Sequence, residues 1–579
     1  MDLVSMVKQK FVGGSNGSKV VLEIDLARGV LVAPPTNPMA ALKAMNAPSM
    51  KALRERLREA ATDDDVLGLV VHLGESGLGL AQAQELALAI AAFGEHKPTL
   101  GFSESFGEFA NALPTYLVGA HCQELWMQPS GELGIGGVHV GITLLKGALG
   151  KLGVDPQFSQ RHEYKTAGDQ FSADHVTEPN REMMQALANS LAHRFVAIVA
   201  ERRGLGEQQV WDAVDNSPLT PQQALDRGLV DQLGYRDQAM AHALKTWDAE
   251  VEQLRFVHRW NSRNPAEQMA HDLVQRKQPT LAVVSLRGGI VSGRGRPGGM
   301  SGQGDTGADV VCESLRAAQR DDKVKAVVLH VDSPGGSAVA SDSIWRAVHQ
   351  LREAGKPVVA QMGTYAASGG YYVSMAADEI VALPATLTGS IGVVGGKFVT
   401  RRTYEKLGLV HEGIDSGRNA GMMASDEWFT DEQWERFHAS LDRIYADFTS
   451  KAAQDRSMPL EQLEPIARGR VWTGADALDR RLVDHLGGMD LAIDRACELA
   501  GLTRSRTHVR PYPALGPLDQ FRPATSTESV GGQGAEALAA TLDGSTGFER
   551  LLALAANRLG VRIDGFLTAP LLAPAIQLG

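Results

Sequence analysis

The 579-residue sequence has little cysteine, and the positions of its cysteines exclude two common roles. Cys122, Cys312 and Cys497 lie far apart and form no CxxC pair. They fit buried or free thiols and form neither a disulfide framework nor a zinc site. The sixteen histidines show no HExxH pattern or other metal-ligand spacing. We therefore expect no metal and no cofactor.

A long apolar run is also missing. The longest, Leu86 to Phe93, is far shorter than the roughly 20 residues that a membrane-spanning helix needs. Residues 1–18 contain no stretch like the central region of a signal peptide. We therefore expect a chain that has no signal peptide and does not cross a membrane, so that the protein is cytoplasmic or bound peripherally to a membrane.

The sequence has no surplus of positive charge. Lysine and arginine number 57 against 68 aspartate and glutamate residues, so the formal net charge is −11. Proteins that bind nucleic acid normally carry a basic surplus. We expect no nucleic-acid partner.

What the sequence does contain is an internal duplication. Residues 116–129 align without gaps on residues 371–384, at an offset of 255 residues. Further along, residues 224–230 (ALDRGLV) match residues 477–483 (ALDRRLV) at an offset of 253. A repeat of this length predicts two equivalent folded units and excludes a short-period solenoid.

Each half has the pattern of an α/β unit. Apolar strands at 20–25 and 66–73 in the first half, and at 281–286 and 324–332 in the second, alternate with helical segments. Continuous apolar strands of this kind predict parallel sheets flanked by helices. We divide the chain into an N-terminal repeat (1–250), a connecting helix or linker (251–279), a C-terminal repeat (280–503) and a tail (504–579) with a flexible linker and a terminal apolar helix over 548–559.

Ser368 is the candidate nucleophile. It stands in YAASGGY (365–371), after an apolar strand and before a helical segment, which places its hydroxyl on a tight turn at a helix N-terminus. A serine there can attack a carbonyl, and the N–H of Gly369 can face the oxyanion that forms. Most Ser-Gly-Gly segments are plain turns, so this motif alone leaves that alternative open.

A second glycine motif follows the strand at 324–331. In DSPGGS (332–337), adjacent glycines let backbone N–H groups approach a ligand without side-chain obstruction. Gly335 or Gly336 is therefore a candidate for the second oxyanion donor, with a plain turn as the alternative. The DSPGGS segment itself has neither phosphate-loop pattern, GxGxxG or GxxxxGK[ST].

Lys165, in YKTA (164–167), is the candidate base. No histidine stands beside a nucleophile in the sequence, although the members of a histidine triad converge only in the fold. A lysine base needs its pKa lowered from about 10.4 to near the working pH, which burial and hydroxyl acceptors could achieve. Ser390, in TGSIG (388–392), is a candidate acceptor. An ordinary surface lysine is the alternative.

The two halves have lost complementary residues. At an offset of 255, Leu113 falls on Ser368 and Lys165 falls on Ala420. The first half therefore keeps the lysine and lacks the serine, and the second half does the reverse. This predicts one active site shared between the repeats.

Together, YAASGGY, DSPGGS, TGSIG and YKTA in a duplicated chain of this size resemble the long form of the signal peptide peptidase A family, also called protease IV. That bacterial family consists of serine/lysine proteases with a fold similar to Clp protease and crotonase, and the likeness covers about residues 20–500. It implies Ser368 as nucleophile, Lys165 as general base, Ser390 as the hydroxyl that positions the lysine, and Gly369 and Gly336 as oxyanion donors.

The same resemblance implies the substrate and the assembly. Remnant signal peptides and other unfolded apolar segments would bind as an added strand in a substrate groove. Its lining would include Asp332, Ser333, Pro334 and Gly335. The family forms homotetramers, and a peripheral membrane contact is compatible with such substrates.

Two other functions stay open from the sequence. A crotonase-type acyl-CoA enzyme uses the same fold and a similar oxyanion hole, and would bind an adenine nucleotide. A non-catalytic assembly scaffold is the second, because the first half lacks the nucleophile.

Overall fold

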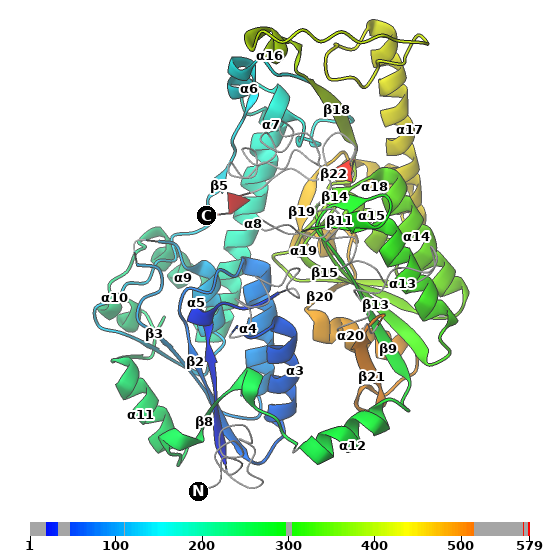
Figure 1. Ribbon diagram of the computed structural model, residues 1–579. Helices are drawn as coiled ribbons and strands as arrows, with labels where there is room; N and C mark the ends of the chain where they lie inside the picture. The colour runs from blue at the N-terminus through cyan, green and yellow to red at the C-terminus, as the bar shows by residue number, and fades with distance from the viewer. Residues whose placement is uncertain are drawn as a thin grey trace, which may run out of the picture. The chain divides into compact units, whose positions relative to one another are not determined.

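The computed structural model forms two compact units (Figure 1). Unit 1 consists of Met1–Gly137 and Ala192–Gln278, and unit 2 of Val138–Leu191 and Pro279–Gly579. The structure describes residues 19–32, 47–108, 110–263, 265–296, 304–513, 571–572 and 577–578. Of the tail predicted over 504–579, the structure describes residues 504–513, 571–572 and 577–578, and the predicted apolar helix over 548–559 lies outside the described residues. No helix within the described ranges is both long enough and apolar enough to span a bilayer.

Unit 1 is built on a parallel sheet of strand order β7-β4-β3-β2-β1-β8. Its strands are β1 (Val20–Asp25), β2 (Val66–His72), β3 (Thr99–Ser103), β4 (Glu124–Met127), β7 (Gln232–Leu233) and β8 (Leu254–Phe256). Its helices are α3 (Met50–Ala61), α4 (Leu80–Gly94), α5 (Leu113–Gly119), α9 (Glu207–Asp215), α10 (Pro221–Asp226), α11 (Arg236–Thr246) and α12 (Pro265–Gln275). Strand β2 is buried along nearly its whole length, as expected for an apolar strand covered by helices on both faces.

Unit 2 has a larger sheet of order β19-β17-β15-β13-β9-β21, from which β16 and β20 branch at β15. Its strands run parallel except for the antiparallel pair β17–β19. They are β9 (Thr280–Arg287), β13 (Val324–Ser333), β15 (Val358–Ala367), β16 (Glu379–Ala382), β17 (Leu387–Gly389), β19 (Val471–Thr473), β20 (His485–Leu486) and β21 (His508–Pro511).

Helices cover both faces of this sheet. Ala282 and Val284 of β9 pack in the cluster that includes residues of α13 (Ala308–Arg320), α14 (Ala338–Glu353) and α17 (Asp431–Asp455). Leu281, whose side chain points the other way, packs with α20 (Met489–Leu499). In Figure 1, helices α13 and α14 lie on one side of the strands β9 and β13, and helix α20 lies on the other side. The predicted α/β fold with tandem units is confirmed.

One segment of the first sequence repeat folds within unit 2. Its elements are β5 (Val140–Gly141), α6 (Lys146–Leu152), β6 (Asp155–Gln160), α7 (Asp169–Ser172) and the first half of α8 (Glu178–Arg203). Strand β6 pairs antiparallel with β18 (Val394–Val399). Phe171 packs edge-on against Phe398 and helps to form a small core with residues of both repeats. The segment that carries Lys165 therefore belongs to the same compact unit as Ser368.

Matching contacts inside the two units agree with the duplication. Tyr116 Oη donates to the carbonyl of Leu229 at 2.8 Å in unit 1, and Tyr371 Oη donates to the carbonyl of Leu482 at 3.0 Å in unit 2. These four residues follow the offsets seen in the sequence. Two ion pairs are related in the same way, Arg203–Asp231 and Arg456–Asp484.

A small sheet in unit 2 contains the DSPGGS glycines. Strand β14 (Gly335–Gly336) pairs parallel with β10 (Ile290–Val291) and antiparallel with β22 (Leu571–Leu572), close to the C-terminus. Next to β10 lie β12 (Asp305–Gly307) and β11 (Gly295–Arg296). In another pair, β23 (Gln577–Leu578) lies antiparallel to β5. Strand β22 therefore lies beside the DSPGGS segment that was predicted to bind substrate, whereas β23 does not contact that segment through its pairing.

Candidate active site

Ser368 occupies the turn between strand β15 and helix α15 (Gly369–Ser374), as the sequence predicted. Its backbone has φ 57° and ψ −117°, a sparsely populated conformation that costs on the order of 1–3 kcal/mol. Two hydrogen bonds hold this turn. The N–H of Ser368 donates to the carbonyl of Gly389 at 2.8 Å, and the N–H of Tyr372 donates to the carbonyl of Ser368 at 2.9 Å. The serine is fully buried.

Lys165 reaches this serine from the loop between β6 and α7. Its Nζ lies 2.7 Å from Ser368 Oγ, and the whole side chain is buried. Burial holds the pKa of Lys165 well below its ordinary value of 10.5, because desolvation penalises the charged form. The lysine is therefore no surface residue, and its amine is close enough to exchange a proton with the serine.

Ser390 supplies two acceptors for the same amine. Nζ of Lys165 donates to the backbone carbonyl of Ser390 at 2.9 Å and to its Oγ at 3.0 Å. A neutral amine has two N–H donors and one lone pair. With both donors directed at Ser390, the lone pair is left for the hydroxyl of Ser368, which is the orientation that a proton acceptor needs.

The glycines of the two motifs approach each other closely. A Cβ at Gly369 would lie 3.0 Å from the backbone nitrogen of Gly336 and 2.7 Å from Ser341 Oγ. A Cβ at Gly336 would lie 2.1 Å from the carbonyl oxygen of Ile290. Both positions therefore require glycine. The N–H of Gly335 donates to Ser333 Oγ at 3.1 Å, so it is already engaged within the loop.

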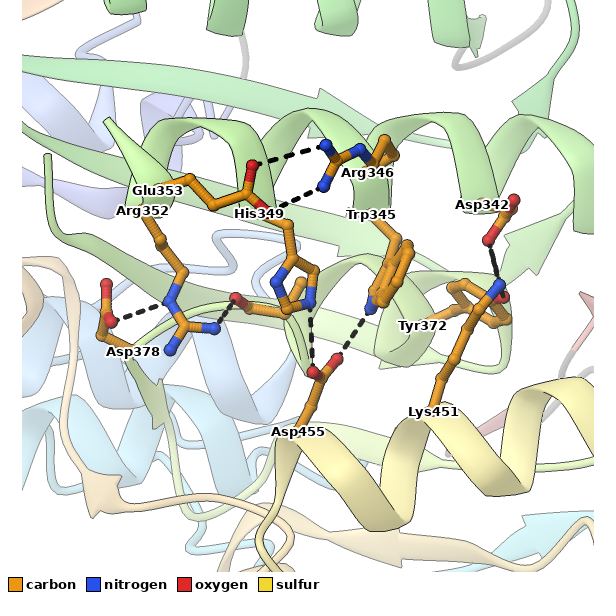
Figure 2. A network of polar contacts seen from close by, with 11 residues as sticks. Asp342, Trp345, Arg346, His349, Arg352, Glu353, Tyr372, Asp378, Lys451 and Asp455 are labelled. Carbon is orange, nitrogen blue, oxygen red and sulfur yellow. Dashed lines mark hydrogen bonds and ion pairs between the residues drawn. The ribbon is translucent and has the colours of Figure 1, made fainter. Parts of the chain in front are cut away.

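A polar network connects α14, which follows Gly336, with α15, which begins at Gly369 (Figure 2). Tyr372 Oη of α15 lies 3.0 Å from Asp342 of α14 and 2.6 Å from Asp447 of α17. Lys451 of α17 pairs with Asp342, and in Figure 2 it lies beside Tyr372. Asp455 of α17 also accepts from two residues of α14, Trp345 at 2.7 Å and His349 at 3.1 Å. The relative position of Gly336 and Gly369 therefore depends on packing that three helices share.

The side chains of Asp332 and Ser333, two of the predicted groove residues, form hydrogen bonds with neighbouring parts of unit 2. Asp332 Oδ1 accepts from the N–H of Tyr365 at 3.1 Å, and the hydroxyl of Ser333 donates to the carbonyl of Gly288 at 2.6 Å. Pro334 has no N–H to offer. The backbone of β14 is what pairs with the neighbouring strand β22.

Gly469 and Arg470, whose carbonyl groups bond to Ser390, were not predicted from the sequence. Ser390 Oγ donates to the carbonyl of Gly469 at 3.3 Å, and the N–H of Ser390 donates to the carbonyl of Arg470 at 2.6 Å. At the offset of 253, Gly469 and Arg470 fall on Asn216 and Ser217. The difference between the two repeats at these positions was the one feature of the sequence that could have indicated a role for Gly469 and Arg470.

Leu113 and Ala420 stand at the sequence positions that match Ser368 and Lys165. Leu113 begins α5 in unit 1, as Ser368 precedes α15 in unit 2, and its side chain is buried in the core. Ala420 is exposed. Neither position retains the chemistry of its counterpart.

The chain matches proteins of known class along most of its length. The model of peptidase family S49 matches residues 106–251 and 350–503, and the Clp protease model matches residues 300–389. The chain is 32% identical to the chloroplastic serine protease SPPA of Arabidopsis thaliana, over 83% of this chain and 69% of that protein. It is 30% identical to protease 4 of Salmonella typhi, over 77% and 71% respectively. Protease 4 of Haemophilus influenzae is 27% identical, over 79% and 74%.

Fold, site and relatives together define a serine-type endopeptidase, and they favour it over the acyl-CoA enzyme and the scaffold. The chain belongs to peptidase family S49. The resemblance to the long form of signal peptide peptidase A is confirmed.

Proposed function

We propose that the enzyme cleaves peptide bonds through an acyl-enzyme formed on Ser368, with Lys165 as the general base. The observation that carries this proposal is the 2.7 Å contact between a fully buried lysine amine and a fully buried serine hydroxyl. A lysine whose pKa is lowered by burial is neutral in a larger fraction of molecules and can accept a proton.

The reaction would proceed in two halves. Lys165 takes the proton of Ser368, whose oxygen attacks the peptide carbonyl and forms a tetrahedral intermediate. The protonated lysine then gives that proton to the leaving amine as the C–N bond breaks. Water attacks the resulting ester, Lys165 takes the proton of the water, and its return to Ser368 Oγ releases the carboxylic acid product.

The N–H groups of Gly369 and Gly336 would stabilise the oxyanion. Their close approach supports this pair, since donors for an oxyanion must converge on one point. Gly336 is favoured over Gly335 because the N–H of Gly335 already bonds to Ser333. Ser390 would position the lysine through its carbonyl and hydroxyl oxygens.

We propose unfolded apolar segments as substrates, remnant signal peptides among them, held as a strand antiparallel to β14. The pairing of β22 with Gly335 and Gly336 supports this, because it demonstrates that β14 accepts an added strand. Asp332 and Ser333 bond inward, so recognition here would rest on backbone hydrogen bonds. Such recognition selects extended chains and tolerates many sequences.

We also propose a homotetramer. The segment after α16 (Arg401–Lys406) exposes large apolar side chains, with Val410 96% and Ile414 94% exposed, and burial against a second copy would remove them from water. Sedimentation should give the mass of four chains, and Val410→Asp with Ile414→Asp should reduce it. If these changes abolish binding to lipid vesicles and leave the mass unchanged, the surface is the peripheral membrane contact instead.

Peptide hydrolysis by matched variants tests the proposed chemistry. Ser368→Ala and Lys165→Met should lose activity while keeping the wild-type circular dichroism spectrum. Lys397→Met is the control, because Lys397 is also buried but donates to the carbonyls of Met422 and Ala424. Near-complete activity in either of the first two variants would refute the mechanism.

A further inference from the structure

We propose that the loop Arg468–Arg470 is a positioning element for the general base, and that it holds Lys165 and Ser390 in one fixed arrangement. This inference rests on the proposed role of Lys165. The loop precedes strand β19 and belongs to the second repeat, whereas Lys165 comes from the first.

Gly469 packs directly on the backbone of the lysine. A Cβ at Gly469 would lie 2.5 Å from both the nitrogen and the Cβ of Lys165, and φ at Gly469 is +83°. Gly392 lies close to both residues: its Cβ would be 2.7 Å from Gly469 Cα and 3.2 Å from Lys165 Cδ. The N–H of Gly469 donates to the carbonyl of Ile391 at 2.7 Å. The start of the lysine side chain therefore fits a space that exists only because two glycines border it.

Arg468, the first arginine of the loop, forms an ion pair with Glu163, two residues before Lys165. Arg468 Nε and Nη2 donate to the carboxylate of Glu163 at 3.0 and 2.8 Å. Such a two-pronged contact fixes the direction as well as the distance between the groups. The pair is partly exposed, so its strength in free energy is modest and its geometry is what matters.

The second arginine holds the residue just before the lysine. The guanidinium of Arg470 lies 4.8 Å from the ring centroid of Tyr164 and 4.5 Å from that of Trp472. It also donates two hydrogen bonds to Glu182, at 2.9 and 2.7 Å. A planar guanidinium between two rings and a carboxylate is a site that lysine cannot reproduce.

The same loop fixes the acceptors of the amine. Ser390 donates its N–H to the carbonyl of Arg470 at 2.6 Å and its hydroxyl to the carbonyl of Gly469 at 3.3 Å. Ser390 in turn accepts both N–H groups of Lys165 Nζ. The loop therefore contacts the backbone end of Lys165 and, through Ser390, its amine end.

Unit 1 contains the counterpart of this contact without the lysine. Ile135, which matches Ser390, donates its N–H to the hydroxyl of Ser217, which matches Arg470, at 2.8 Å. The junction between the two loops is thus kept in both units. The arginines, the glycine and the serine hydroxyl occur only in the unit that holds the base, which argues for a role in catalysis beyond loop folding.

Gly469→Ala tests the inference. Relieving a 2.5 Å contact requires a displacement of about 1 Å, and a misplacement of that size costs on the order of 100-fold in rate. The displacement also admits water to Nζ, which raises the pKa of Lys165 toward its ordinary value. We expect kcat to fall while KM stays unchanged, the acid limb of the pH profile to move to higher pH, and part of the lost rate to return at alkaline pH.

The control is Gly355→Ala, which introduces the same side chain at φ +76° where a Cβ would meet no atom within 4 Å. It should keep the wild-type pH profile. Arg470→Met, with Arg470→Lys as the conservative variant, repeats the test should Gly469→Ala not fold. Both should move the acid limb, and lysine should not restore it, because it cannot stack as arginine does.

A rate loss that is equal at every pH, or a Gly469→Ala profile like that of Gly355→Ala, would overturn the inference. Lys165→Met in the same assay distinguishes a failure of the positioning role from a failure of the proposed function. If that variant is inactive while the loop variants behave as wild type, only the positioning role is wrong. If it is active, the proposed function itself is wrong.

Discussion

Ser390→Ala removes one hydroxyl from the site and keeps everything else that the lysine contacts. The substitution preserves the Cβ, so the positive φ of 50° at this position is no more strained than before. Lys165 Nζ still has the carbonyl of residue 390 at 2.9 Å and Ser368 Oγ at 2.7 Å. It loses only the 3.0 Å contact with the hydroxyl.

The expected decrease in kcat is set by the transition state, where this contact is strongest. In the transition state the lysine becomes an ammonium ion, and a hydrogen bond to a charged group contributes about 1.5–3 kcal/mol. Its loss corresponds to a decrease of about 10- to 150-fold in kcat. KM should change little, because Ser390 contacts the base and not the substrate.

Steady-state hydrolysis of an unfolded peptide measures both constants. The matched control is Ser314→Ala, a buried serine whose hydroxyl donates to the carbonyl of Val310 within helix α13. It should keep the wild-type kcat. The reasoning is refuted if Ser390→Ala also keeps it, or if the two variants lose activity equally.

Three other predictions concern stability, substrate competition and assembly of the site. Because burial lowers the pKa of Lys165, the unfolded chain binds more protons than the folded one below pH 10.5, so this group favours folding more as pH rises. Lys165→Met should therefore raise Tm at neutral pH, and the gain should shrink toward pH 10.5; a gain independent of pH would contradict this. Truncation after Leu559 removes β22, which occupies β14, so KM for peptides should fall at constant kcat; an unchanged KM would count against substrate binding there. Cutting the chain near residue 265 places Lys165 and Ser368 on different fragments, so each fragment alone should be inactive and mixing the two should restore hydrolysis. Activity in the C-terminal fragment alone would exclude the shared site.

The sequence predicted the parts of the site that are local. Ser368 could be found because strand, turn and helix follow one another in one short segment, and the structure places it on that turn. Lys165 was one candidate base in the sequence, its role was implied by the resemblance to the peptidase family, and the repeat added that alanine stands at the matching position 420. The structure then brought its amine within 2.7 Å of the serine hydroxyl.

The remaining features depend on contacts between distant segments. Gly469 and Lys165 are about 300 residues apart, and no periodicity in either segment indicates that their backbones touch. An alignment of repeats predicts two equivalent units, and it does not reveal that residues 138–191 fold with the second half. The inward bonds of Asp332 and Ser333 likewise depend on neighbours in the fold, Tyr365 and Gly288.

The central claim is that Lys165 activates Ser368, and a covalent label tests it most directly. The wild-type protein is treated with a fluorophosphonate, which acylation-competent serines attack, and the intact mass and the modified peptide are determined. We predict one adduct per chain, on Ser368, and no adduct on Lys165→Met under the same conditions. An adduct on another residue, or labelling of Lys165→Met at the wild-type rate, would contradict the account.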